Sequence, residues 1–427
     1  MLHFCFPLSG RQRSRAPAHT DAFVLEFVVS HGKALVETMM RLAIVLGAAL
    51  GAEAFVARPT PKYMAVTRRP AAAKVNMDMA ILPKINKLLK SPVIGGVPIV
   101  PVVAGVAVAA PVIKKILDTP SRTYNREENT VGKEYDAWTE EGILEHYWGE
   151  HIHLGWYSPQ EMKDGYKKKN FIQAKYDFID RMMAFSGLNA LEKPPAKVLD
   201  VGCGIGGTSR YLASKLGSDS HVTGITLSPN QVARATALAK ERGLDNTEFK
   251  VMDALAMKFP DNSFDMVWAC ESGEHMPDKK KYVEEMARVL KPGGVMVMAT
   301  WCSRDDTEKP LDEVERKNLN YLESEWTHPH FISIEDYVKH FESTGYLETI
   351  HSEDWWECTI ASWRHSIWVG VYDPWPVVRR PWVWYKTLRD GICLERFHRS
   401  FDTGLMGYGM VRARKSTEGY MVKDVTM

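Results

Sequence analysis

A short stretch of the chain, from Glu271 to His275, holds two carboxylates and an imidazole within five residues. Side chains of these types exchange protons, and a well-positioned general base contributes roughly 10²–10⁴-fold to a reaction rate. We therefore take His275 as the first candidate base, with Glu271 or Glu274 orienting its ring. His151 and His153 are the next candidates. These two histidines could also bind a metal from a strand, but no third ligand stands nearby, so no metal is expected.

A glycine-rich turn, DVGCGIGG from Asp200 to Gly207, is the second group of residues that could do chemistry. Glycines permit a tight turn and let a ligand approach the backbone closely. Gly202, Gly204 and Gly207 satisfy the dinucleotide-binding pattern, so a nicotinamide or flavin enzyme has to be considered. Such sites use an apolar strand before the first glycine and a ribose-binding carboxylate about 20 residues later. Here Asp200 precedes the loop, and the next strand ends in GITLS without a carboxylate.

The elements that must position these groups alternate between strands and helices. Short β-branched apolar runs predict strands at 197–201, 221–226, 247–252, 264–270 and 295–301. Apolar residues at helical spacing predict helices at 229–242 and 279–290, the second followed by a KPGG turn. This order is typical of an α/β fold with a doubly wound parallel sheet covered by helices. The fourth predicted strand ends just before Glu271, at the edge of the sheet where ligands bind.

Together with Met252-Asp253-Ala254 and the run FPDNSFD, the pattern resembles the class I methyltransferases, which use S-adenosyl-L-methionine. The resemblance covers about Lys197 to Trp301 and implies a cofactor-binding domain over 191–301, with a Rossmann-like sheet. It implies that the glycine loop holds the methionine part of the cofactor and that Asp253 and Ala254 meet the adenine. The cofactor-binding residues expected on this basis are Tyr135, Asp200, Gly202, Cys203, Gly204, Gly206, Thr226, Leu227, Gln231, Asp253, Ala254 and Glu271.

One departure from that family concerns the ribose. Many members place a carboxylate at the end of the second strand, whereas this chain has the neutral Thr226 and Ser228, with Gln231 a turn later. The resemblance therefore implies a weaker or water-mediated ribose contact. Thr226 and Ser228 can equally be a plain strand end and helix cap.

Upstream of that domain, residues 124–190 are rich in His, Glu and aromatic side chains, a composition that suits a helical segment covering the cofactor. The run EEGILEHYWGEHIHLG is most similar to cyanobacterial and algal enzymes that methylate phytylbenzoquinols. The runs ESGEHMPDK and TWCSRD resemble γ-tocopherol methyltransferases. The resemblance extends from about Tyr135 to Met410 and implies C-methylation of a tocopherol, a step of vitamin E biosynthesis.

Other acceptors and another class of protein stay open. The first alternative acceptor is 2-methyl-6-phytyl-1,4-benzoquinol of the tocopherol and plastoquinone pathway. Further alternatives are a sterol or phosphoethanolamine. A catalytically silent cofactor-binding protein is a hypothesis of a different class.

The C-terminal region, 302–415, holds most of the tryptophans: nine of the 13 lie at or beyond Trp301. Aromatic side chains combine apolar area with a polar edge, which suits a lipophilic prenylated phenol or a membrane interface. We expect a helical, aromatic-rich cap followed by C-terminal strands. Ordinary packing of the cap is the alternative. With 54 basic and 53 acidic side chains, no overall field favours nucleic acid.

The N-terminal region has the composition of a targeting segment. Residues 40–54 have the layout of a signal peptide and 54–77 lack acidic residues, which predicts a signal plus transit presequence over 1–80. The run AEAFVARP resembles the presequence junction of algae with secondary plastids, implying a chloroplast envelope or thylakoid membrane. The 23 uncharged residues at 91–113 are long enough for a transmembrane anchor. Their prolines leave a linker or surface helix as alternatives.

Overall fold

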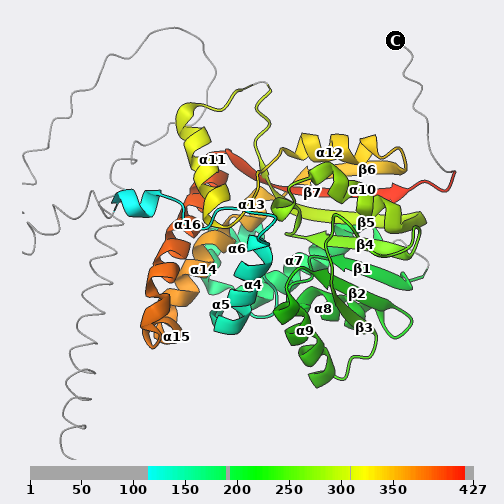
Figure 1. The fold of residues 1–427 in the computed structure, drawn as a ribbon, viewed down its shortest axis with the longest axis horizontal. Helices are drawn as coiled ribbons and strands as arrows, with labels where there is room; N and C mark the ends of the chain where they lie inside the picture. Colours follow the sequence, from blue (N-terminus) through cyan, green and yellow to red (C-terminus); the bar gives the residue numbers. More distant parts are fainter. Residues whose placement is uncertain (1–113, 189–192, 308, 419–427) are drawn as a thin grey trace, which may run out of the picture. The chain divides into compact units, whose positions relative to one another are not determined.

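Residues 114–188, 193–307 and 309–418 are described by the computed structural model, and their strands form one seven-stranded sheet (Figure 1). The order of strands is β3-β2-β1-β4-β5-β7-β6. Neighbours among β1 to β5 are parallel, whereas β7 runs antiparallel to both β5 and β6. The strands are β1 (Lys197–Val201), β2 (His221–Thr226), β3 (Thr247–Val251), β4 (Phe264–Cys270), β5 (Leu290–Ser303), β6 (Leu347–Asp354) and β7 (Met406–Lys415).

Helices cover the sheet and also gather beside it. Figure 1 shows α11, α14, α15 and α16 grouped at one side of the sheet, with α4 and α5 next to them. The helices and 3-10 turns are α4 (Thr130–Glu141), α5 (Ile143–Trp148), α6 (Pro159–Asp164), η2 (Tyr166–Lys168), α7 (Phe171–Ser186), α8 (Gly207–Leu216), α9 (Pro229–Glu241), η4 (Gly273–His275), α10 (Lys279–Val289), α11 (Glu313–Glu325), α12 (Ile334–Ser343), α13 (Trp356–Thr359), α14 (Ala361–Tyr372), α15 (Trp375–Val378), η5 (Pro381–Val383) and α16 (Trp384–Asp402).

The sheet separates two hydrophobic cores. Val198 of β1 and Val297 of β5 belong to one core, with apolar residues of α7 and α8. Their neighbours Leu199 and Met298 belong to the other, with residues of α10 and α12. Successive strand residues point to opposite faces, so a strand covered on both sides must be apolar throughout. This requirement explains the continuous apolar runs that predicted the strands.

The predicted α/β class with a doubly wound sheet is confirmed. β1, β2 and β4 have the predicted limits, and β3 ends one residue earlier. The predicted KPGG turn instead lies within β5, where Leu290 pairs with Phe264 and Val295 with Met266. Pro292 has no N–H to donate and Gly293 has a φ of 77°, so the regular ladder is interrupted there by a bulge.

The C-terminal region adds strands to the sheet as well as helices beside it. Its last strand, β7, lies between β5 and β6, pairing from Met406 with Ser303 to Arg414 with Val295. The range 302–415, predicted as a helical cap followed by C-terminal strands, contains α11 to α16 together with β6 and β7, and β6 lies between α12 and α13.

Two N-terminal predictions, the presequence over 1–80 and the apolar membrane segment over 91–113, lie outside the described residues and stay predictions. In the part of the chain that the structure describes, no helix combines the length and apolar character needed to cross a bilayer.

Candidate active site

The glycine loop turns at the carboxyl end of β1. Gly202, Gly204 and Gly206 have left-handed backbones, with φ of 86°, 54° and 75°. A Cβ on Gly202 would lie 2.3 Å from the Cβ of Ser272, so glycine is needed there for space as well as for conformation. The Gly202 N–H donates to the carbonyl of Ile225, which ties the loop to the end of β2. The backbone is thereby exposed to a ligand above the strand ends.

A cavity of about 310 Å³ opens above this loop, at the carboxyl ends of β1, β2, β3 and β4. The segment that precedes and begins α4 closes its other side. Among the predicted cofactor residues, those lining the cavity are Tyr135, Gly202, Gly204, Thr226, Leu227, Gln231, Asp253, Ala254 and Glu271. The sequence therefore predicted part of this wall, mainly at the ends of β1, β2 and β3.

Three predicted cofactor residues lie under the wall instead of on it. Asp200 accepts a hydrogen bond from Ser209 Oγ at 2.5 Å, and burial raises the pKa of Asp200 to about 6. Cys203 packs against Gly224, where an added Cβ would come within 2.8 Å of its side chain. Gly206 caps α8. These residues shape the loop and do not line the cavity.

At the end of β2, neutral side chains bind one another. Thr226 Oγ1 donates to Gln231 Oε1 at 2.7 Å. Ser228 caps α9, accepting from the Gln231 N–H, and its hydroxyl donates to Asp136 Oδ1. Asp136 also accepts from the N–H of Asn230 at 3.2 Å. A carboxylate of α4, Asp136, therefore lies at this strand end, but it binds Ser228 and Asn230 and does not line the cavity.

The segment from Tyr124 to Tyr135 forms the cover of the cavity. Asn129, with a left-handed φ of 48°, caps α4 by accepting from the Gly132 N–H. Arg126 lies 3.4 Å from Asp253 on the predicted adenine side. The range 124–190 was predicted to cover the cofactor, but these individual residues were not.

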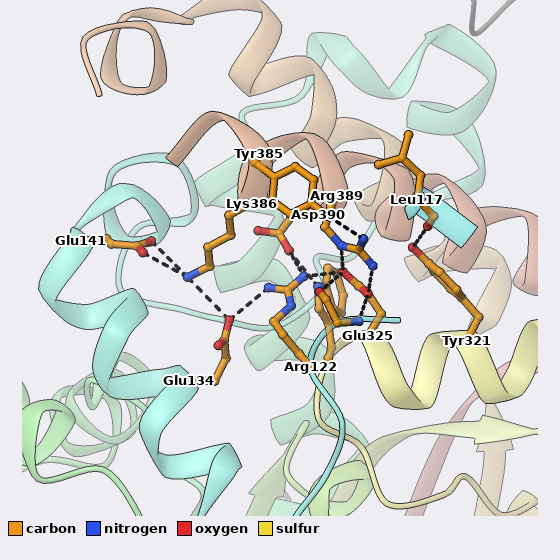
Figure 2. A network of polar contacts seen from close by, with 12 residues as sticks. Leu117, Arg122, Glu134, Glu141, Tyr321, Glu325, Tyr385, Lys386, Arg389 and Asp390 are labelled. Carbon is orange, nitrogen blue, oxygen red and sulfur yellow. Dashed lines mark hydrogen bonds and ion pairs between the residues drawn. The ribbon is translucent and has the colours of Figure 1, made fainter. Parts of the chain in front are cut away.

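A network of ion pairs fixes this cover to the helices beside the sheet (Figure 2). Arg122 Nη2 lies 3.0 Å from Glu325 Oε1, and Arg389 Nε donates to the same oxygen at 2.7 Å. Arg122 also reaches Glu134 of α4 at 3.0 Å and Asp390 of α16 at 2.5 Å. Glu325 is fully buried. The network therefore links α4, which lines the cavity, to α11 and α16.

Glu271 stands at the inner end of the cavity, directly after β4. Its Oε1 accepts from the Leu154 N–H at 2.7 Å and from the Tyr408 hydroxyl at 2.6 Å. No hydrogen bond among the described residues involves Oε2. Burial, and then the charge of Glu274, raise the pKa of Glu271 well above the usual value. Its backbone φ of 49° is strained for a residue with a Cβ, as residues at functional sites often are.

Tyr135, and neither glutamate, holds His275. The Tyr135 hydroxyl and His275 Nε2 are 3.0 Å apart, and the His275 ring stacks on His328 with centroids 4.5 Å apart. Glu274 instead accepts from Thr300 Oγ1 at 2.8 Å. No hydrogen bond among the described residues therefore joins His275 to either glutamate, as the predicted orienting role would require. Tyr135 is the residue that contacts its ring nitrogen. Burial lowers the pKa of His275 to about 3, so its ring is neutral near pH 7.

His151 and His153 face away from the cavity, while Ile152 between them lines it. Both imidazoles are buried. His151 Nδ1 lies 3.3 Å from Thr208 Oγ1, and His153 Nδ1 donates to the carbonyl of Leu154 at 2.8 Å. The extended backbone alternates the directions of its side chains, so these candidate bases are not placed to meet an acceptor in the cavity.

Sequence reasoning missed Arg126, Asp136 and His328. Each contacts a residue far away in the chain: Asp253, Ser228 and His275 respectively. Their residue types were visible, but no local spacing marked them.

The chain is similar to known methyltransferases in sequence and in fold. A family model described as a methyltransferase domain matches residues 192–349. The chain is 43% identical over 293 residues to the 2-methyl-6-phytyl-1,4-hydroquinone methyltransferase of Synechocystis sp., covering 67% of this chain and 87% of that one. It is 39% identical over 283 residues to a probable chloroplastic tocopherol O-methyltransferase of Oryza sativa subsp. japonica, covering 64% and 75%.

Among solved structures, the fold is similar to that of a putative sarcosine dimethylglycine methyltransferase from Galdieria sulphuraria. The TM-score is 0.54 at 23% identity, over 65% of this chain and 98% of that one. This likeness concerns the fold alone.

Proposed function

The chain belongs to the family of S-adenosyl-L-methionine-dependent methyltransferases that includes the tocopherol and methylphytylhydroquinone enzymes, and on that premise we propose that it methylates a ring carbon of a tocopherol. The conversions are γ- to α-tocopherol and δ- to β-tocopherol, in vitamin E biosynthesis. The observation that carries the proposal is the 39% identity to the rice relative, which extends over 75% of that protein.

A second acceptor, 2-methyl-6-phytyl-1,4-benzoquinol, is favoured by a specific observation. The cyanobacterial relative named for that hydroquinone is 43% identical over 87% of its length. Both acceptors are phenols with a long apolar tail, so the same site can serve either. They differ in whether the second ring oxygen is a free hydroxyl or part of a closed chromanol ring.

The residues around the cavity fit S-adenosyl-L-methionine. Glycine backbone faces it at Gly202 and Gly204, and Gln231 Nε2 is buried there without a partner among the described residues. Gln231 would hold the ribose, with Asp253 and Ala254 beside the adenine. The bound cofactor supplies an electrophilic methyl group on a sulfonium.

The protein itself orients the acceptor and removes a proton from it. A phenol has an ordinary pKa near 10, and its ortho carbon becomes more electron-rich as the proton leaves. Glu271 Oε2 is the accessible base, because both hydrogen bonds to this carboxylate engage Oε1. The raised pKa of Glu271 makes its ionised form a stronger base toward the phenol, and this carboxyl must lose its own proton before it can act.

An acceptor assay tests this function. Purified full-length protein is supplied with methyl-labelled cofactor and γ-tocopherol, 2-methyl-6-phytyl-1,4-benzoquinol, a sterol or phosphoethanolamine. Label should enter γ-tocopherol, and nuclear magnetic resonance of the product should show a ring methyl and not a methyl ether. Transfer to the quinol alone would select the second acceptor. Absence of S-adenosylhomocysteine with every acceptor would favour a silent binding protein.

The proposal includes a plastid membrane as the place of the reaction. The rice relative is named as chloroplastic. Large aromatic side chains between the end of α14 and the start of α16 are exposed: Tyr372 63%, Trp375 47%, Trp382 75%, Trp384 42% and Tyr385 54%. Trp and Tyr favour the interface between water and lipid. Arg389 of α16 donates to the carbonyl of Ile116, close in sequence to the apolar range 91–113.

Flotation of the full-length protein with anionic lipid vesicles tests this surface. The double variant Trp382→Ser/Trp384→Ser should bind several-fold less protein than the wild type. Val251→Ser, which changes an exposed apolar residue on β3, is the control and should bind as the wild type does. Equal binding by all three proteins would remove the aromatic surface from the proposal. Release of the protein by alkaline carbonate would argue against a spanning segment at 91–113.

A further inference from the structure

Residues 150–154, here called the bridging segment, connect the glycine loop with Glu271. At one end, Glu150 Oε2 accepts a hydrogen bond from Arg210 Nη2 at 2.5 Å. At the other end, the Leu154 N–H donates to Glu271 Oε1 at 2.7 Å. Ile152, between the two ends, lines the cavity. A segment this short spans at most roughly 14 Å between its end Cα atoms, so it leaves little slack between the two contacts.

Arg210 is the residue that ties Glu150 to the glycine loop. Its side chain is fully buried, and its Nη1 donates to the carbonyl of Ile205 in the loop at 2.7 Å and to that of Ala235 on α9 at 3.3 Å. A buried cation needs a carboxylate beside it, because the loss of hydration is otherwise uncompensated. Glu150 provides that carboxylate and also accepts from Arg242 at the end of α9.

The backbone of the bridging segment also packs on the first turn of α8. A Cβ on Gly207 would collide with the Glu150 carbonyl oxygen, so the segment would have to move away from the helix. Gly207 has no left-handed backbone and does not line the cavity, so the approach of Glu150 is what requires glycine there. His151 Nδ1 adds a contact with Thr208 Oγ1 at 3.3 Å. The segment is thus seated on the same helix start that follows the glycine loop.

We propose that Glu150 is a positioning residue, which holds the base Glu271 in register with the cofactor-binding loop through Arg210 and the bridging segment. The inference rests on the proposed function, in which Glu271 removes the phenolic proton. A misplacement of about 1 Å can cost as much as 10²-fold in rate, so the distance from the base to the cofactor loop matters for methyl transfer. Glu150 itself does not line the cavity and acts only through the segment that it anchors.

The contact between Leu154 and Glu271 also affects the acidity of the base. Burial, and then the charge of Glu274, raise the pKa of Glu271, and the hydrogen bonds from Tyr408 and Leu154 oppose that rise. Displacement of the Leu154 N–H should therefore raise the pKa further. The titratable groups that face Glu271 lie on other elements: Glu274 on η4, Tyr408 on β7, Lys175 on α7, Tyr135 on α4 and Cys270 on β4. A substitution at Glu150 changes none of these side chains.

A pair of matched substitutions in the full-length protein tests the role of Glu150. Glu150→Gln removes the charge that pairs with Arg210. Glu145→Gln is the control, because Glu145 forms a neighbouring ion pair with Arg234 at 2.6 Å that joins α5 to α9 without reaching the glycine loop. Both variants lose one carboxylate from a pair with an arginine, and only the first disturbs the bridging segment.

A second pair disturbs the same segment without removing a charge, and it keeps the test decisive if Glu150→Gln does not fold. Gly207→Ala should push the Glu150 carbonyl away from α8. Gly391→Ala is its control, since a Cβ on this α16 residue meets no atom within 4 Å outside the backbone of its own helix. Alanine at either position suits a helix.

Turnover is measured with the acceptor that the wild type methylates best, and hydrogen exchange of the Leu154 amide is followed in parallel. Glu150→Gln and Gly207→Ala should each lower kcat roughly 10-fold or more, with the KM for S-adenosyl-L-methionine changed less than threefold. The acidic limb of the pH profile of kcat should move to higher pH by roughly half a unit or more. Exchange at Leu154 should become roughly 10-fold faster. Both controls should stay within about twofold of the wild type.

The inference is overturned if kcat, or exchange at Leu154, is unchanged in both Glu150→Gln and Gly207→Ala. A loss confined to the KM for the cofactor would also overturn it, because Glu150 would then support cofactor binding alone. A wild type that methylates no phenol would refute the proposed function instead. Exchange at Leu154 would still decide, in that case, whether Glu150 fixes the hydrogen bond to Glu271.

Discussion

Glu325 and His328 lie three residues apart, yet their buried polar atoms have opposite surroundings. Both oxygens of Glu325 accept hydrogen bonds, from Arg389, Arg122 and Ser121. Neither nitrogen of His328 has a partner among the described residues. In the ion-pair network, Arg122 Nε is an unpaired exception. The difference separates polar atoms that hold helices together from polar atoms that are buried without a hydrogen bond to any described residue.

The largest effect is expected at Glu271, which belongs to both categories: one oxygen is paired and the other is not. Glu271→Gln should reduce kcat roughly 10²–10⁴-fold, because an amide cannot take the phenolic proton. Affinity for S-adenosyl-L-methionine, measured by calorimetry, should change less than threefold. Glu285→Gln is the control, since Glu285 binds Arg288 away from the cavity. Equal losses of kcat in the two variants would end the assignment of Glu271 as base.

The ion-pair network can be disrupted at Glu325, the carboxylate shared by Arg122 and Arg389. Glu325→Gln leaves Arg122 and Arg389 without their shared carboxylate and should lower the free energy of unfolding by about 3 kcal/mol. This is the lower end for buried pairs, because Arg122 and Asp390 keep 13% and 27% of their side-chain exposure. Urea denaturation measures the change. The exposed pair of Glu313 and Lys317 provides the control, and Glu313→Gln should cost less than about 1 kcal/mol. Equal losses of unfolding free energy in the two variants would show that the ion-pair network does not stabilise the fold.

Asp200 is an intermediate case, with one hydrogen bond from Ser209 and a pKa raised to about 6 from 3.8. A carboxyl whose folded pKa is raised stabilises the protein below pH 3.8, and this contribution is lost as the pH rises through 6. Asp200→Asn does not titrate, so its stability relative to the wild type should increase by roughly 2 kcal/mol between pH 4 and pH 8. Urea titrations at several pH values test the sign. A constant difference would show that the carboxyl is not perturbed.

The smallest effect is expected at Tyr337, a buried residue that does not line the cavity. The Tyr337 hydroxyl is buried without a partner among the described residues. Tyr337→Phe should change the free energy of unfolding by less than about 1 kcal/mol and kcat/KM for the acceptor by less than twofold. A large fall in kcat/KM would show that the Tyr337 hydroxyl takes part in catalysis or acceptor binding despite its position outside the cavity.

The features that could be predicted from the sequence are those that depend on local interactions. The strands, the glycine turn and Glu271 were found because their signals are local: apolar runs, a need for left-handed backbone, and a position directly after β4. The predicted part of the cavity wall follows from the same few elements, since parallel strands bring their carboxyl ends to one edge.

The acceptor side depends on contacts between distant segments, and there the predictions were less accurate. His151 and His153 have side chains that can act as bases, but the backbone direction places their rings in the core. The sequence THPHF did not predict the stacking of His328 on His275. That contact depends on where α11 ends relative to η4 and on the left-handed backbone of Thr327. Asp136 likewise acts through a serine 92 residues away.

The placement of β7 has a consequence for synthesis. The strand occupies the gap between β5 and β6, and Tyr408 on it provides the hydroxyl that holds Glu271. While residues 406–415 are still inside the ribosome, β5 presents an unpaired edge and the sheet cannot close. β5 and β6 therefore gain their shared partner, and Glu271 its hydrogen bond from Tyr408, only after residues 406–415 have left the ribosome.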